Sequence, residues 1–221
     1  MSEAEAGPTD ITHHVQTAVE ELEATSRLRD HAIAESRQIV RFSANAIRAL
    51  HRGDIPAGER LIAQSRERLR VLVSLSAPEP TVYWAGFVQD AMKEHAEAAI
   101  VSAILSESPV PYASSLGVEI APYLNGAAEG ASELRRQILD LLRHGEITTA
   151  ERLFTSMESV YEALLTVDFP DAITGGLRRS TDQLRGVVER TRGDLTLTTR
   201  QLRLEQALRD QHDHAIKERN H

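Results

Sequence analysis

The sequence predicts an all-α protein that folds as a single domain. Apolar residues recur every three to four positions along most of the 221 residues, which is the period of an amphipathic helix, and alternating β-branched runs are missing. Hydrophobic residues make up 41% of the chain but aromatic residues only 4%, so Ala, Leu, Ile and Val must build the core. We predict a bundle of about seven helices over residues 10–217, preceded by a mobile N-terminus of residues 1–9.

Two glycines and a proline mark the clearest helix ends. Gly53 and Gly145 each follow a helically periodic segment, and glycine readily adopts the left-handed conformation that ends many helices. Pro56 fits the first turn of the next helix, where its missing N–H costs nothing. The segments 50–62 and 142–154 resemble each other around these glycines. Because two distant copies do not make a repeat array, we interpret them as one turn used twice.

Further signals set the remaining boundaries. Thr148 and Glu151 have the spacing of a capping box, which predicts a helix start at that point. Asp194 can cap a last helix after an interruption at Gly193. Prolines break the chain between the other periodic segments. The predicted helices therefore cover residues 11–51, 56–76, 82–106, 114–144, 148–166, 171–192 and 194–217.

Charge is unevenly distributed along the chain, whose net charge is −8. Residues 27–70 carry ten arginines against five acidic residues, and residues 178–203 carry seven arginines against three. Between them, residues 71–177 carry fifteen acidic residues against four arginines and one lysine. On charge alone, ordinary solvated helix faces are the more frequent explanation. The alternative is a track for a polyanion beside an acidic site.

Composition also excludes several classes of protein. The chain has no cysteine, which rules out disulfides, a thiolate nucleophile and a cysteine-held metal. A signal-peptide pattern and an apolar run of membrane-spanning length are both missing, so we expect a cytoplasmic protein without membrane contact. Neither a Walker-type phosphate loop nor a dinucleotide fingerprint occurs.

The predicted helix 82–106 carries two acids in apolar surroundings. Glu94 and Glu97 are three residues apart and therefore share a helix face, among neighbours that are almost all apolar. Buried carboxylates are costly and repel each other, so an arginine, a proton or a divalent cation must offset their charge. Spacing alone favours a salt bridge to an arginine of a neighbouring helix. A hard cation, Mg²⁺ or Mn²⁺, is the sharper alternative because such ions prefer carboxylate oxygens.

Two other predicted helices add acids at the spacing of one turn. Glu129 and Glu133 lie among glycine, alanine and serine residues, which allow a second helix to approach closely. Glu158 and Glu162 follow on the next helix. Carboxylates from facing helices can build a metal cluster inside a bundle. The Glu-x-x-His motif of di-iron bundles is absent, which favours Mg²⁺ or Mn²⁺ over redox iron.

Several of these segments, in this order and spacing, resemble the translin family. The resemblance covers about residues 25–210, and no single motif in it is highly specific. The run that includes Glu94 and Glu97 is similar to the Glu-x-x-Glu signature of the family's subunit called translin-associated factor X. The matching segments are Lys93-Glu-His-Ala-Glu-Ala98, Tyr123-Leu-Asn-Gly126, Glu129, Ser132-Glu-Leu-Arg135, Val160-Tyr-Glu162, Asp168-Phe-Pro170, Gly176-Leu-Arg-Arg179 and Arg192-Gly193.

The resemblance implies a seven-helix fold assembled into a hollow octamer that binds single-stranded RNA or DNA and can enclose short duplexes. It implies that the factor X type is a Mg²⁺-dependent endoribonuclease, whereas translin itself mainly binds nucleic acid. By position, Glu94 and Glu97 match the catalytic pair, and Glu129 and Glu133 match further acidic positions near the site. Glu162 stands where factor X has the shorter Asp, so the metal geometry could differ.

These implications define the predicted site. Glu94, Glu97 and Glu162 are the candidate catalytic residues, and these three with Glu129 and Glu133 are the candidate ligands of Mg²⁺ or Mn²⁺. We expect a homo-oligomer, an octamer by the resemblance, that cleaves RNA, with single-stranded DNA as a further partner. The alternative is a binding protein of the same family without catalysis. The candidate nucleic-acid-binding residues are Arg178, Arg179 and Arg185, which match basic family positions, together with Arg37 and Arg41.

Overall fold

The computed structural model describes residues 11–219, and the predicted mobile segment 1–9 lies outside them. Within this range the chain forms nine helices and no strand, which confirms the all-α prediction. Six helices are long and three are single turns. Their bounds are α1 Ile11–His51, α2 Ile55–Ser76, α3 Pro80–Tyr83, α4 Gly86–Leu105, α5 Ala113–Leu116, α6 Ile120–Arg143, α7 Ile147–Leu165, α8 Asp171–Thr174 and α9 Leu177–Arg219.

The single turns account for most differences from the prediction. The predicted helix 82–106 is divided at Trp84 into α3 and α4, and the predicted helix 114–144 is divided at Gly117, whose φ of 72° is left-handed. Gly175 and Gly176, with φ of 61° and 82°, separate α8 from α9. Gly193 does not interrupt α9, because one glycine costs a long, packed helix only about 1 kcal/mol.

The turns after α1 and α6 share one geometry, as their similar sequences predicted. Gly53 and Gly145 have φ of 77° and 78°. In both turns the next residue, Asp54 or Glu146, donates its N–H to a carbonyl five residues back. Glu146 is also the N-cap of α7, so the helix begins one residue before Thr148, and the predicted capping box is wrong.

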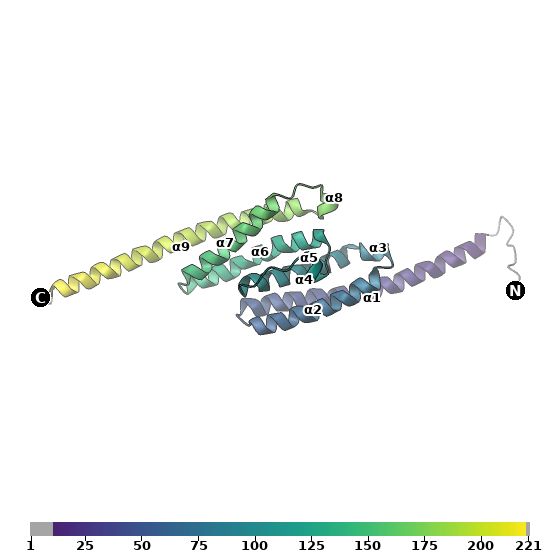
Figure 1. Ribbon diagram of the computed structural model, residues 1–221, viewed down its shortest axis with the longest axis horizontal. Coiled ribbons are helices and arrows are strands. Elements are labelled where there is room, and N and C mark those ends of the chain that lie inside the picture. Colours follow the sequence, from purple (N-terminus) through teal and green to yellow (C-terminus); the bar gives the residue numbers. More distant parts are fainter. Residues whose placement is uncertain (1–10, 220–221) are drawn as a thin grey trace.

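The helices pack as two groups joined through α4 (Figure 1). The first group is the α1–α2 hairpin with the first half of α4. The second comprises α6, α7 and α9 with the last turns of α4. Each group has its own apolar core, and the α4–α6 contact lies where the two meet. The largest fully buried apolar residues are Ile39, Leu50, Leu69, Leu72, Met92, Ile100, Leu134, Ile138, Leu153, Met157 and Leu184.

The first turns of α1 and the last part of α9 extend beyond the bundle at opposite ends (Figure 1). Both extensions carry apolar side chains that this single chain leaves exposed, namely Ile11, Val15, Val19 and Leu22 on α1, and Leu197, Leu204 and Leu208 on α9. Within residues 11–219, no helix is both long and apolar enough to span a bilayer.

Candidate metal and nucleic-acid site

The site is built on a close contact between α4 and α6, where two glycines of α6 face the backbone of α4. A Cβ atom on Gly126 would lie 2.7 Å from the Lys93 carbonyl oxygen, and one on Gly130 would lie 3.3 Å from the Glu97 carbonyl oxygen. At position 126 only glycine fits without moving a helix, and at position 130 a larger residue would be tightly packed. The small residues noted in the sequence thus bring the α6 acid Glu129 against α4.

Three carboxylates converge at this contact. One oxygen from each of Glu94, Glu97 and Glu129 can be chosen so that all three lie within 4.8 Å of one another. Glu97 is only 7% exposed, whereas Glu94 and Glu129 are half-buried. We refer to these three residues as the acid triplet. The structure therefore unites three of the five predicted ligands.

Burial and mutual repulsion make the charged triplet unfavourable by itself. Burial raises the pKa of Glu97 to about 8, with further contributions from the charges of Glu94, Glu129 and Glu133. Burial also raises the pKa of Glu94, against the opposing effect of Lys93. The metal-free site therefore holds Glu97 largely protonated near neutral pH.

Lys93 supplies one positive charge to the triplet. Its Nζ lies 2.9 Å from Glu129 Oε1 and 3.8 Å from Glu94 Oε1. Burial alone would lower the pKa of Lys93, but the hydrogen bond to Glu129 and the surrounding acids raise it. The expected arginine from a neighbouring helix is thus replaced by a lysine of α4 itself. Among the described side chains, none forms a hydrogen bond or ion pair with Glu97.

The acid triplet fits a small divalent cation. It offers oxygen ligands only, from two helices, and Mg²⁺ and Mn²⁺ prefer such ligands. When all three carboxylates are ionised, the single ammonium of Lys93 leaves an excess of negative charge, which a divalent cation would offset. The most buried carboxylate, Glu97, is also the one without a partner among the described side chains.

Glu133 lies near the triplet but has another partner. Its Oε2 lies 2.8 Å from Nε2 of His51, whose side chain is buried at the end of α1. This hydrogen bond lowers the pKa of Glu133. Glu133 therefore adds negative charge to the site, as its effect on the pKa of Glu97 shows, while its oxygen is held by α1.

The structure does not bring Glu162 to the triplet, contrary to the prediction. Glu162 is exposed on α7. The buried face of that helix carries Leu153, Met157 and Leu164, and position 162 lies away from this face. Glu158, one turn earlier, forms an ion pair with Arg192 of α9 at 2.6 Å.

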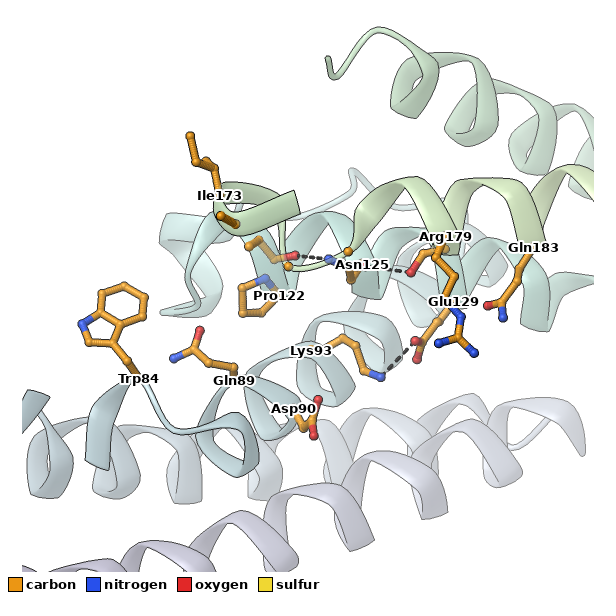
Figure 2. A pocket seen from close by; sticks show the side chains of 15 residues that line it. Trp84, Gln89, Asp90, Lys93, Pro122, Asn125, Glu129, Ile173, Arg179 and Gln183 are labelled. Carbon is orange, nitrogen blue, oxygen red and sulfur yellow. Dashed lines mark hydrogen bonds and ion pairs between the residues drawn. The ribbon is translucent and has the colours of Figure 1, made fainter. Parts of the chain in front are cut away.

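A cleft of about 630 Å³ opens beside the triplet (Figure 2). Its walls come from four places, namely the start of α4 with the preceding turn, the first half of α6, the α8–α9 turn and the start of α9. Asn125 fixes this geometry, since its Nδ2 donates to the Thr174 carbonyl and its Oδ1 accepts from the Ser180 hydroxyl. The lining includes Trp84, Gln89, Asp90, Lys93, Pro122, Asn125, Glu129, Ile173, Arg179, Ser180 and Gln183.

The five predicted arginines are all exposed but lie in different places. Arg179 lines the cleft itself. Arg178 lines two neighbouring hollows beside α8, and Arg185 lies further along α9. Arg37 and Arg41 of α1 line a separate hollow that includes Asp90, the residue that also borders the cleft. Their hollow therefore adjoins the cleft across the start of α4.

His95, between Glu94 and Glu97 in sequence, is turned into the α1–α2 side of the bundle. Its Nδ1 lies 2.9 Å from the Ser65 hydroxyl, which lies 3.0 Å from the Ser43 hydroxyl. Burial lowers the pKa of His95 to about 4, so the ring is neutral. His95 belongs to the polar part of the core and not to the acid triplet.

Sequence reasoning missed two residues that shape the cleft, Trp84 and Asn125. Trp84 is the sole tryptophan in a chain with few aromatic residues, and it follows the turn at Pro80. An exposed tryptophan beside a turn is a usable signal for a binding residue. Asn125 lies in the family-like segment Tyr123-Leu-Asn-Gly126, but its role could not be inferred from the sequence because it depends on the α8–α9 turn some fifty residues away.

Comparison with known proteins gives matches over most of the chain. No family model matches it. An uncharacterized protein of Methanocaldococcus jannaschii is 29% identical over 185 residues, or 82% of this chain and 81% of that protein. The structure of AfC3PO with duplex RNA matches with a TM-score of 0.77 at 29% identity, covering 84% of this chain and 96% of the other.

Two further solved structures have the same fold. The crystal structure of AfC3PO matches with a TM-score of 0.74 at 31% identity, covering 85% of this chain and 96% of the other. Apo-NeC3PO matches with a TM-score of 0.74 at 20% identity, covering 83% of this chain and 96% of the other, which supports the fold alone.

Proposed function

This chain belongs to the translin family, and we propose that it binds RNA and cleaves it as a Mg²⁺- or Mn²⁺-dependent endoribonuclease. The observation that carries the proposal is the acid triplet, in which a buried carboxylate meets two others and lacks a partner among the described side chains. The similarity to AfC3PO, whose structure holds duplex RNA, supports RNA as the substrate class.

In this proposal Glu94, Glu97 and Glu129 hold the metal. The bound ion would supply a nucleophile at neutral pH, by lowering the pKa of water, and would offset charge on the phosphate. The close approach of α4 and α6 fixes the three carboxylates relative to one another. Glu133, whose carboxylate is bound to His51, adds negative charge near the ion without coordinating it.

Arginines of α9 would hold the nucleic acid. Arg179 borders the same cleft as Glu129, so a phosphate bound by its guanidinium would lie beside the triplet. Arg178 and Arg185 continue along α9, and Arg37 and Arg41 lie on the other side of α4. Such contacts to the backbone position a strand without reading its bases, so we expect weak sequence preference.

We also propose that the protein self-associates. The extensions of α1 and α9 expose rows of apolar side chains, which a second copy could cover. An octamer, which the family resemblance implies, would be seen in light scattering as eight times the chain mass of 24.5 kDa. Single-stranded DNA remains a second candidate ligand, since phosphate contacts alone do not distinguish it.

The alternative is a binding protein without catalysis. Two observations favour it, because Lys93 already neutralises Glu129 and Glu162 does not reach the triplet. Under this alternative, RNA binding would be the same with and without metal.

Cleavage of labelled single-stranded RNA separates the two functions. We expect cleavage with Mg²⁺ or Mn²⁺, none with EDTA, and none by Glu97→Gln purified in parallel, although that variant still binds RNA. Cleavage by Glu97→Gln at the wild-type rate would show that the site assignment is wrong. Retention of RNA by both proteins, with cleavage by neither, would establish the binding function alone.

A further inference from the structure

The cleft beside the acid triplet has two chemically different ends (Figure 2). One end is mostly apolar and carries Trp84, Pro122 and Ile173, with Gln89 beside them. The other end is polar and carries Arg179, Gln183, Lys93 and Glu129. Trp84 is 60% exposed, although tryptophan is a large apolar residue that proteins usually cover.

The turn that carries Trp84 is fixed by hydrogen bonds of its backbone and of the neighbouring Tyr83. The backbone N–H of Trp84 donates to the Pro80 carbonyl, and the Trp84 ring meets that of Tyr83 edge-on at 5.1 Å. The Tyr83 hydroxyl in turn donates to Glu119 Oε1 at 2.5 Å, and Gln89 Nε2 donates to the Tyr83 carbonyl. An exposed aromatic side chain on a fixed turn is preorganised for a flat ligand.

Arg179, at the polar end, keeps its guanidinium available. Among the described side chains it has no ion-pair or hydrogen-bond partner, unlike Arg135 and Arg192 on the same side of the bundle. A free guanidinium is suited to a phosphate because its donors form a planar fork. Glu129 lies beside it, so a phosphate here would adjoin the acid triplet.

We propose that this cleft is a subsite for a short unstacked strand, in which one base stacks on Trp84 and a backbone phosphate further along the strand binds Arg179. The proposal rests on the RNA-binding function above and specifies its substrate. A base inside a duplex is stacked on both sides and cannot reach an aromatic side chain. The preferred substrates are therefore single strands, bulges and strand ends.

A protein partner on Trp84 is the rival explanation, since exposed tryptophans are also common at protein interfaces. The lining of the cleft argues against it. Interface centres are depleted of charged residues, whereas Asp90, Lys93, Glu129 and Arg179 all border this cleft. An aromatic side chain at one end and an arginine at the other suit a base and a backbone phosphate of one short strand.

Because Trp84 is the sole tryptophan, its fluorescence reports on this cleft directly. We would titrate the full-length protein in EDTA with single-stranded oligouridylate, and measure binding in parallel by anisotropy of a fluorescein-labelled copy. We expect quenching that saturates with the anisotropy, and no quenching by an abasic ribose-phosphate oligomer of equal length. Trp84→Ala should bind the RNA about 5- to 150-fold more weakly, the range of aromatic stacking on one base, and Trp84→Phe should bind in between.

The matched control is Tyr112→Ala, which removes an aromatic side chain that is 80% exposed outside the cleft and should change affinity less than twofold. Thermal unfolding would verify that each variant is folded. If RNA binds but neither quenches Trp84 nor depends on it, the nucleotide subsite is refuted and the proposed function stands. If no RNA binds, both fail. If Trp84 fluorescence instead follows protein concentration, and Trp84→Ala lowers the assembly mass, a protein interface replaces the subsite.

Discussion

Both the α4–α6 contact and the α7–α9 contact carry glutamates one helical turn apart, but the carboxylates differ in burial and in their partners. At α4–α6, Glu97 is buried and lacks a partner among the described side chains. At α7–α9, Glu158 reaches the half-exposed Arg192, and Glu162 faces solvent. The difference shows that the spacing of acids does not define a metal site. The surroundings decide whether the charge needs a cation.

The close approach of α4 and α6 explains why Glu97 is buried. Gly126 and Gly130 let α6 approach α4 so closely that the acids between them lose water. On α9, by contrast, no atom of the described residues outside the helix's own backbone lies within 4 Å of the position that a Cβ on Gly193 would take. The side chains of Glu158, Glu162 and Arg192 are partly or fully exposed, so these carboxylates stay hydrated and an ion pair with arginine forms at little cost.

Replacing one glutamate in each region by glutamine should give the largest difference in metal binding and cleavage. Glu97→Gln should reduce Mn²⁺ binding and metal-dependent cleavage on the order of 10²-fold or more, because a neutral amide replaces a charged ligand. Glu162→Gln should change either quantity less than twofold. Isothermal calorimetry with Mn²⁺ and cleavage rates test this pair. Equal losses in both variants would mean that Glu162 reaches the metal in the assembled protein.

A larger side chain between α4 and α6 should lower both stability and metal binding, because it disturbs the acid triplet. Gly126→Ala would set a methyl group 2.7 Å from the Lys93 carbonyl oxygen, so the helices must separate. We expect a loss of about 1–3 kcal/mol in the free energy of unfolding, as for an overpacked core, and weaker metal binding as Glu129 moves away. Denaturant unfolding with Mn²⁺ calorimetry measures both. Unchanged metal affinity would show that the triplet does not depend on this separation.

The raised pKa of Glu97 makes the first region sensitive to pH. Burial moves this pKa to about 8 from an ordinary value near 4.5, so the folded state binds a proton that the unfolded state releases. The stability of the metal-free protein should therefore fall as pH rises between these values. Metal needs the carboxylate, so metal affinity should increase about tenfold per pH unit up to about pH 8.

Unfolding midpoints measured across this pH range, with and without saturating Mg²⁺, test that coupling. The increase in the unfolding midpoint on adding Mg²⁺ should be small at low pH and large above pH 8. Glu97→Gln should flatten both trends, whereas Glu162→Gln should leave them unchanged. A wild-type protein whose gain from Mg²⁺ does not vary with pH would contradict the assignment.

The cations of the two regions should also behave differently. Lys93→Met removes the ammonium that competes with a metal for Glu129 and Glu94. We expect Mn²⁺ to bind about tenfold more tightly, as expected for losing one nearby positive charge, and the metal-free protein to melt earlier. Arg192→Met, in the exposed contact, should leave Mn²⁺ affinity unchanged. Weaker Mn²⁺ binding by Lys93→Met would contradict competition between lysine and metal.

The sequence predicted the helices well because periodicity and glycine ends are local signals. It also predicted that Glu94 and Glu97 share a face and that small residues of α6 permit a close contact. It could not separate Glu129 from Glu162, because their burial depends on which helices meet. Nor did it reveal the pairing of Glu133 with His51, eighty-two residues apart, or the cleft that ends at Trp84.

Gly193→Ala should produce the smallest effect and test the open side of the comparison. The predicted interruption at Gly193 would require glycine, whereas a continuous α9 with free space around this position would accept a methyl group. Alanine stabilises a helix interior by about 0.5–1 kcal/mol relative to glycine, so the unfolding free energy should rise slightly. Metal and RNA affinity should not change. Destabilisation by Gly193→Ala, read from denaturant unfolding, would instead indicate that another chain packs against this position of α9, since no atom of the described residues lies there to clash.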